Sequence, residues 1–214
     1  MTDRRGICRW RSLAVIATVM VLTAMACARQ EPSAAAATSA DQESPNPTVL
    51  AGSDILVEPT PGAEAVTYNP ALAPAGATIL TSVRSAGYDH SQVVVTISVA
   101  GFLPNRGYAV HAHTQPCGAT GGDAGPHYQN RIDPAATPEA PSTNPEYANP
   151  RNEFWLDVRT NATGSGSSRT TVPFGFTDRV PRSIVVHEAM TTATAPGQAG
   201  QAGDRIACVT LARQ

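Results

Sequence analysis

Apolar and polar residues alternate with a period of two along much of the chain after residue 54. The clearest run, residues 91–102, places Val93, Val95, Ile97 and Val99 on one side of an extended chain and mostly polar residues on the other. This alternation is typical of β-strands with one buried face. Similar runs, mostly separated by Gly, Pro, Asn or Asp, occur at residues 54–59, 78–84, 107–113, 153–160, 167–174, 183–188 and 206–212.

Helices are not expected in this part of the chain. No stretch has a persuasive helical period, and the 18 prolines and 17 glycines of the chain suit loops better than helices. Two segments, residues 118–152 and 189–204, are too long and too polar for tight turns. Because long loops on a rigid β scaffold commonly carry functional sites, we expect such a site here. The pattern predicts an all-β domain, an antiparallel sandwich or barrel of about eight strands with two long functional loops.

The first 27 residues have the features of an export signal. Four arginines precede an apolar stretch at residues 13–26, which is shorter than the roughly 20 residues of a membrane-spanning helix. Small residues before Cys27 fit ordinary signal cleavage, but Cys27 also matches the lipid-acceptor position of bacterial lipoprotein signals. We therefore expect an exported protein, either a lipoprotein on the outer face of the cell membrane or a secreted or periplasmic protein.

After this signal the sequence divides into a tether and one domain. Residues 28–54 are rich in Ala, Ser, Pro and polar residues and lack apolar periodicity, which predicts a disordered tether. Residues 55–214 have a normal length for a domain with a single core. A net charge of −2, with no basic run outside the signal, argues against nucleic acid as a partner. No pattern predicts the oligomeric state, and a lipid on Cys27 is the one membrane contact that we expect.

Four of the five histidines fall at strand ends or in an adjoining loop. His111 and His113 are two apart in the run at 107–113, so they project from the same face of a strand. His187 ends the run at 183–188, and His127 follows a glycine-rich turn that can bring it back toward His111 and His113. Two imidazoles side by side can hold one metal ion, although alternating strands also produce such pairs by chance.

Two cysteines, Cys117 and Cys208, lie in the predicted domain. In an exported protein a disulfide between them is expected, and two unrelated buried thiols are the alternative. The bridge would tie the glycine-rich loop to the last strand. It would close a loop of about 90 residues and contribute about 4 kcal/mol to stability in the loop-entropy model.

Four segments of the chain, taken together, resemble the copper/zinc superoxide dismutases. They are GYAVHAHTQPC at residues 107–117, AGPHYQ at 124–129, IVVHE at 184–188 and QAGDRIACVTL at 201–211. The resemblance extends over most of the domain and implies an eight-stranded Greek-key barrel of immunoglobulin-like character. It also implies that Cys117 and Cys208 form the structural disulfide. Arg205 would guide the superoxide anion, although the residues alone would also allow a surface salt bridge with Asp204 or Glu188. The copper ligands implied are His111, His113, His127 and His187.

The chain departs from this family at the zinc site. In zinc-containing members the loop after the third copper ligand supplies two further histidines and an aspartate, but no histidine occurs between His127 and His187 here. Carboxylates alone make a poor structural zinc site, because zinc favours nitrogen and sulfur ligands. We therefore predict one copper ion per chain and no zinc of the family type. The candidate oxygen ligands that remain are Asp123, Asp133, Glu153 and Asp157.

Two further features of the family are missing. The aspartate that follows the VVHE histidine is absent from the stretch EAMTTATAPGQ, so the group that orients His111 is not identified. The loop at 189–204 is nearly free of charge, apart from Asp204 and the adjacent Arg205.

We predict an exported, copper-dependent superoxide dismutase without zinc, which converts superoxide to oxygen and hydrogen peroxide by cycling between Cu(II) and Cu(I). Two other functions remain open. One is a non-catalytic copper-binding or copper-buffering lipoprotein on the same fold, and the other is a structural or adhesive β-domain. Measuring turnover would distinguish the dismutase from the copper-binding lipoprotein, and measuring metal content would distinguish both from the structural β-domain.

Overall fold

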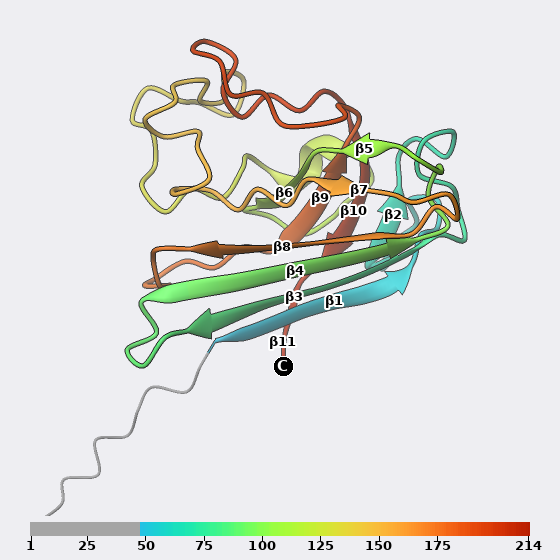
Figure 1. Ribbon diagram of the computed structural model, residues 1–214, viewed down its shortest axis with the longest axis horizontal. Coiled ribbons are helices and arrows are strands. Elements are labelled where there is room, and N and C mark those ends of the chain that lie inside the picture. The colour runs from blue at the N-terminus through green and yellow to red at the C-terminus, as the bar shows by residue number, and fades with distance from the viewer. Residues whose placement is uncertain (1–47) are drawn as a thin grey trace, which may run out of the picture. The chain divides into compact units, whose positions relative to one another are not determined.

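Residues 48–214, described by a computed structural model, form an all-β domain (Figure 1). The predicted signal, the proposed lipid acceptor Cys27 and the predicted tether up to residue 47 lie outside the described residues. The strands are β1 (Val49–Ile55), β2 (Ala65–Thr67), β3 (Thr78–Ala86), β4 (Gln92–Ala100), β5 (Gly107–Tyr108), β6 (Val110–His113), β7 (Val158–Arg159), β8 (Gly166–Val172), β9 (Ser183–His187), β10 (Arg205–Thr210) and β11 (Ala212–Arg213). One short 3₁₀ helix, η1 (Gly121–Ala124), lies between β6 and β7.

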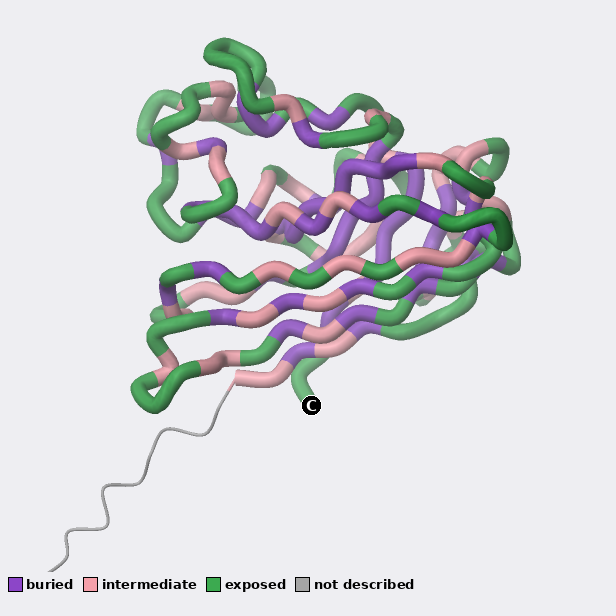
Figure 2. The backbone as a smooth tube through the Cα atoms, in the orientation of Figure 1, coloured by how far each residue is buried: buried purple, intermediate pink, exposed green. Residues whose placement is uncertain are grey.

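The strands pair into two main antiparallel sheets. The larger has the order β11-β1-β3-β4-β8 and the smaller β2-β10-β9-β6, while β5 and β7 form a separate pair. Apolar residues of both main sheets belong to one buried cluster, so the core lies between them. The alternation predicted for residues 91–102 is confirmed in β4, whose buried and more accessible residues alternate along the strand (Figure 2).

The sheets are not closed into the predicted barrel. Within residues 48–214, β6 and β8 each pair with only one other strand, and the second side of β6 makes isolated bridges, such as that between His113 and His127. A long loop follows β6 in place of a strand that could pair with both sheets. The strand predicted at 153–160 is reduced to β7, because the residues before it make only isolated bridges, His111 to Trp155 and Gln129 to Glu153.

The domain begins earlier than the sequence indicated. The tether was expected to run to residue 54, but β1 pairs with β3 from Val49 to Ile55 and buries Leu50. Small and polar residues give this strand a weak apolar pattern. Gly52, which suits a linker, instead lies against the backbone of Thr210, where a side chain would clash. The prediction for residues 48–54 was therefore wrong.

The disulfide and the long loops agree with the sequence. Cys117 and Cys208 are bonded and connect the loop after β6 to β10. The loop after β6 and the loop between β9 and β10 lie on the same side of the smaller sheet (Figure 1). No helix within the described residues is long and apolar enough to cross a membrane.

Candidate metal centre

Three of the four candidate histidines project from one face of the smaller sheet. His111 and His113 are on β6, and His187 is the last residue of β9, which pairs with β6. Val110 and Ala112 point from β6 into the core between the sheets. Because side chains alternate along a strand, His111 and His113 point to the opposite face. The site therefore lies outside the main core.

The loop after β6 brings His127 back over this face, as the sequence predicted. The chain turns at η1, and His127 then forms an isolated bridge with His113. The long loops cover the face, so that His111, His113 and His187 are at most 3% exposed, while His127 is partly accessible. The loops thus bury a set of imidazoles that the sheet alone would leave in solvent.

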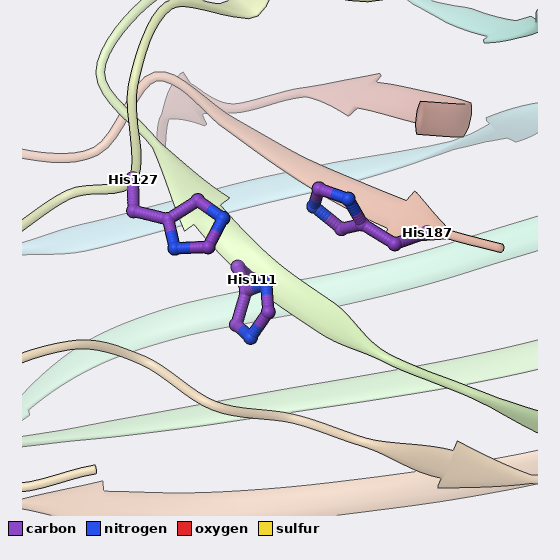
Figure 3. A group of neighbouring side chains, drawn as sticks. All are labelled: His111, His127 and His187. Carbon is purple, nitrogen blue, oxygen red and sulfur yellow. The ribbon is translucent and has the colours of Figure 1, made fainter. Parts of the chain in front are cut away.

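The imidazole rings meet in one place (Figure 3). One ring nitrogen from each of His111, His127 and His187 lies within 4.8 Å of the other two. His113 lies outside this group of three, but its Nε2 is 3.3 Å from Nε2 of His187. Its ring centroid is also 4.8 Å from that of His127. His113 therefore adjoins the three-histidine group.

Two glycine carbonyls determine which nitrogens of His113 and His187 carry a proton. Nδ1 of His113 donates to the carbonyl of Gly125 (2.9 Å), and Nδ1 of His187 donates to that of Gly203 (3.3 Å). Both glycines have a positive φ, a conformation that glycine adopts without strain. A neutral imidazole carries one N–H, so Nε2 of each ring is left with a lone pair. These lone pairs face each other across 3.3 Å, which favours a cation between them.

His111 is oriented by a hydroxyl and a carboxylate. Oγ1 of Thr192 donates to Oδ1 of Asp157 (2.6 Å) and lies 2.8 Å from Nε2 of His111. Since the hydroxyl proton goes to the carboxylate, Nε2 of His111 donates to Oγ1. Nδ1 of His111 is then an acceptor, and it is buried with no hydrogen-bond partner within the described residues. Thr192 and Asp157 therefore orient His111. The sequence did not identify this group, because the aspartate expected from the family is missing.

A second carboxylate, Glu153, orients His127. Nδ1 of His127 donates to Oε2 of Glu153 (3.2 Å), which leaves Nε2 of His127 with a lone pair. Glu153 is 2% exposed, and its oxygens also accept from Nε2 of Gln129 (2.8 Å) and Nε1 of Trp155 (2.7 Å). These donors stabilise the buried carboxylate.

Burial keeps His111, His113 and His187 uncharged. Desolvation, followed by repulsion from His127 and the other rings, holds the pKa of His111 and that of His113 well below the ordinary value. The same desolvation lowers the pKa of His187 to about 3. These three imidazoles are therefore neutral at pH 7 and able to act as ligands, because a protonated imidazole has no lone pair to give.

The arrangement fits a metal ion. Each of the four histidines has one nitrogen fixed by an oxygen partner and the other left as an acceptor that faces its neighbours. An unpartnered buried acceptor is costly, and a metal ion would remove that cost. Carbonyl and carboxylate partners on the distal nitrogen are typical of metal-bound histidines. Imidazole ligands suit copper, zinc, iron and nickel.

Arg205 lies beside this centre. It is the first residue of β10, and its pairing partner on the neighbouring strand β9 is His187. Its Nη1 donates to the carbonyl of Gly121 (2.7 Å), and within the described residues it forms no ion pair with Asp204 or Glu188. The guanidinium is half-buried and its burial lowers its pKa, yet an arginine remains charged at neutral pH. It provides a positive charge next to the histidines, held in place by its hydrogen bond to Gly121.

The structure also contains site residues that the sequence did not assign correctly. Glu153 and Asp157 were considered only as oxygen ligands for zinc, and neither Trp155 nor Thr192 was singled out. Trp155 donates to Glu153, and its ring lies 5.9 Å from that of His111. No local spacing could reveal the contact between Thr192 and Asp157, because these residues are 35 apart and meet only when the loops fold.

Comparison of the sequence with known protein families and with curated proteins finds no match to either.

Proposed function

We propose that this chain is an exported, copper-dependent superoxide dismutase that works without zinc. The observation that carries the proposal is the set of four imidazoles whose acceptor nitrogens face one another, with His113 and His187 only 3.3 Å apart at Nε2. The sequence resemblance supplies the reaction, and the all-β scaffold of two antiparallel sheets is compatible with a Greek-key, immunoglobulin-like arrangement. The disulfide supports export, because such bonds persist mainly in oxidising compartments.

Copper is the metal we propose for the centre, held by His111, His113, His127 and His187. Four nitrogen donors suit Cu(II), and a site that can release one donor also suits Cu(I). When bound, copper would supply one-electron exchange, by which one superoxide is oxidised to oxygen and a second is reduced to hydrogen peroxide with the uptake of two protons.

The residues around the centre have distinct roles in this proposal. Arg205 attracts the superoxide anion to the entrance and raises its local concentration. Thr192 and Asp157 hold the proton of His111 on Nε2, and the loops exclude bulk water from the buried rings. Glu153 accepts a hydrogen bond from Nδ1 of His127, which leaves Nε2 of that ring for copper. His127 is the partly accessible ring, so it is suited to exchange protons with solvent.

The test uses residues 28–214, loaded with copper and dialysed. Metal content is measured by mass spectrometry and superoxide consumption by pulse radiolysis, with His127→Ala and Arg205→Gln as variants. We expect one copper per chain, with rapid turnover that falls strongly in His127→Ala. Arg205→Gln should slow the reaction and weaken its dependence on ionic strength. Arg169→Gln on β8, whose side chain is exposed, is the matched control and should leave the rate almost unchanged.

Other outcomes would lead to the alternative functions. One tightly bound copper without turnover would indicate a copper-binding or copper-buffering protein. Failure to retain copper would contradict the centre itself and leave a structural β-domain. Equal effects of Arg205→Gln and Arg169→Gln would show that net charge, rather than a guiding residue, sets the rate.

A further inference from the structure

A cavity of about 670 Å³ adjoins the metal centre, with His127 and His187 in its wall. It lies between the loop after β6 and the loop that precedes β10. Its volume is typical of sites that bind small organic molecules, which span roughly 300–1,000 Å³. A diatomic anion needs a volume on the order of tens of Å³, similar to that of a water molecule. The cavity is therefore much larger than superoxide requires.

The walls of the cavity are mainly apolar. Prolines contribute rigid hydrocarbon surfaces and no backbone N–H, and threonine, serine and glutamine side chains lie among them. Residues 137–141 on one side are exposed, which opens the cavity to solvent and gives a ligand a route of entry. The apolar lining includes Pro126, Ile132, Pro138, Pro141 and Ala202.

Two arginines give the cavity a positive charge. Arg179 and Arg205 both line it, and neither forms an ion pair with a carboxylate within residues 48–214. Nη2 of Arg179 donates to the backbone carbonyls of Gln129 (3.1 Å) and Asn130 (3.2 Å), which fixes the position of the guanidinium without neutralising it. Among the described residues the wall contains one carboxylate, that of Glu153, and it already accepts hydrogen bonds from three side chains.

We propose that this cavity binds a small organic carboxylate with an aromatic ring, of the size of benzoate. The apolar walls would contact the ring, and the carboxylate would accept charge-assisted hydrogen bonds from the guanidinium of Arg179, with Arg205 adding to the positive potential. The proposal goes beyond the proposed dismutase function and does not require the centre to hold copper. A ligand bound here would lie at the entrance to the centre and limit the access of other anions.

The experiment is a calorimetric titration of the metal-free protein with three probes. Benzoate combines ring and charge, acetate has the charge alone, and benzyl alcohol has the ring alone. We expect benzoate to bind at least about tenfold more tightly than acetate or benzyl alcohol. Acetate lacks the contacts of the ring and benzyl alcohol lacks the charge, and losing either interaction should weaken binding by about tenfold or more. Equal affinity for acetate and benzoate, or no binding of benzoate, would overturn the proposal.

Variants then test the position of the ligand. Arg179→Gln should weaken benzoate binding about three- to tenfold, and Ala140→Trp, at an exposed position in the cavity wall, should weaken it about tenfold by filling the space. Arg169→Gln removes the same charge far from the cavity and should have no effect. If Arg169→Gln weakens binding as much as Arg179→Gln, or if Ala140→Trp leaves it unchanged, benzoate does not occupy this cavity.

The two proposals can fail separately. Because the titration uses metal-free protein, loss of copper binding or of dismutation would leave the result for benzoate intact. Conversely, an active copper enzyme that does not bind benzoate would disprove only the cavity ligand. A thermal melt of each variant establishes that it is folded before its affinity is measured.

Discussion

The contact between Thr192 and His111 gives a quantitative prediction for metal affinity. In Thr192→Val the side chain keeps nearly the same shape but loses the hydroxyl that lies 2.8 Å from Nε2 of His111. The metal-bound state needs the lone pair of Nδ1, so Nε2 must keep its proton. In the variant this N–H is buried, with Thr192 and His111 no more than 5% exposed, and it has lost the one acceptor that residues 48–214 provide.

The magnitude follows from the cost of that unpaired N–H. A buried donor without a partner costs roughly 1–3 kcal/mol. The middle of this range, about 2 kcal/mol, corresponds to about a 30-fold loss of affinity. In the metal-free variant the proton can move to Nδ1 and the ring can shift toward the acceptor nitrogens of the neighbouring imidazoles, which lowers the cost. In the bound state Nδ1 must stay unprotonated, so this relief is lost. Most of the penalty therefore appears as weaker metal binding and only a smaller part as lower stability.

The assay is a competition titration of Cu(II) against a chelator of known affinity. Thr192→Ser keeps the hydroxyl and should stay within about threefold of the natural protein, because the hydrogen bond is retained. Thr191→Val is the matched control. Oγ1 of Thr191 donates to Oδ2 of Asp157 (2.7 Å), whereas the hydroxyl that bonds His111 is that of Thr192, and the Thr191 side chain is exposed. It should also change the affinity by less than about threefold.

Two results would refute this reasoning. One is an unchanged copper affinity in Thr192→Val, and the other is an equal loss in Thr192→Val and Thr191→Val. Nitrogen NMR of the metal-free natural protein gives an independent check, because it should find the proton of His111 on Nε2 and a bare Nδ1. A proton on Nδ1 would mean that Thr192 does not set the tautomer.

Three further predictions concern stability and the other carboxylate. The pKa of His187 is lowered to about 3, so the unfolded chain binds more protons than the folded one between pH 6.5 and 3. The free energy of unfolding of the metal-free protein should therefore fall by about 2 kcal/mol at pH 5 through His187 alone. Urea unfolding at pH 7 and pH 5 measures this, and equal stabilities would contradict it. Replacing Cys117 and Cys208 together by Ser removes a bridge with a sequence separation of 91. The free energy of unfolding should fall by about 4 kcal/mol, which lowers Tm by about 10 °C in calorimetry. A fall in Tm of under about 3 °C would argue against the loop-entropy origin of this stability. In Glu153→Gln the charge that faces Nδ1 of His127 is lost, so the same copper titration should find about tenfold weaker binding, and an unchanged affinity would exclude this role.

The sequence by itself determined the strands whose alternation is strong. β4 follows its apolar pattern residue by residue, because one face of the strand packs in the core and the other does not. The spacing of His111 and His113 likewise placed both on one face of β6. The disulfide between Cys117 and Cys208 was also predicted. These features depend on local periodicity or on composition, which the sequence contains directly.

Only the tertiary structure decided how each histidine is oriented. The partners of the rings, among them Gly203, Glu153 and the pair Thr192 and Asp157, reach the site only when their segments fold over the smaller sheet. The alternation at residues 153–160 predicted a strand there, but it did not place Glu153 or Asp157 beside a histidine. The tertiary structure also decided that residues 49–55 form β1. In the sequence Gly52 suits a linker, but in the fold it packs against the backbone of Thr210. A hydrogen bond between residues far apart in the chain depends on where two loops pack, and neither loop carries a sequence signal for that position.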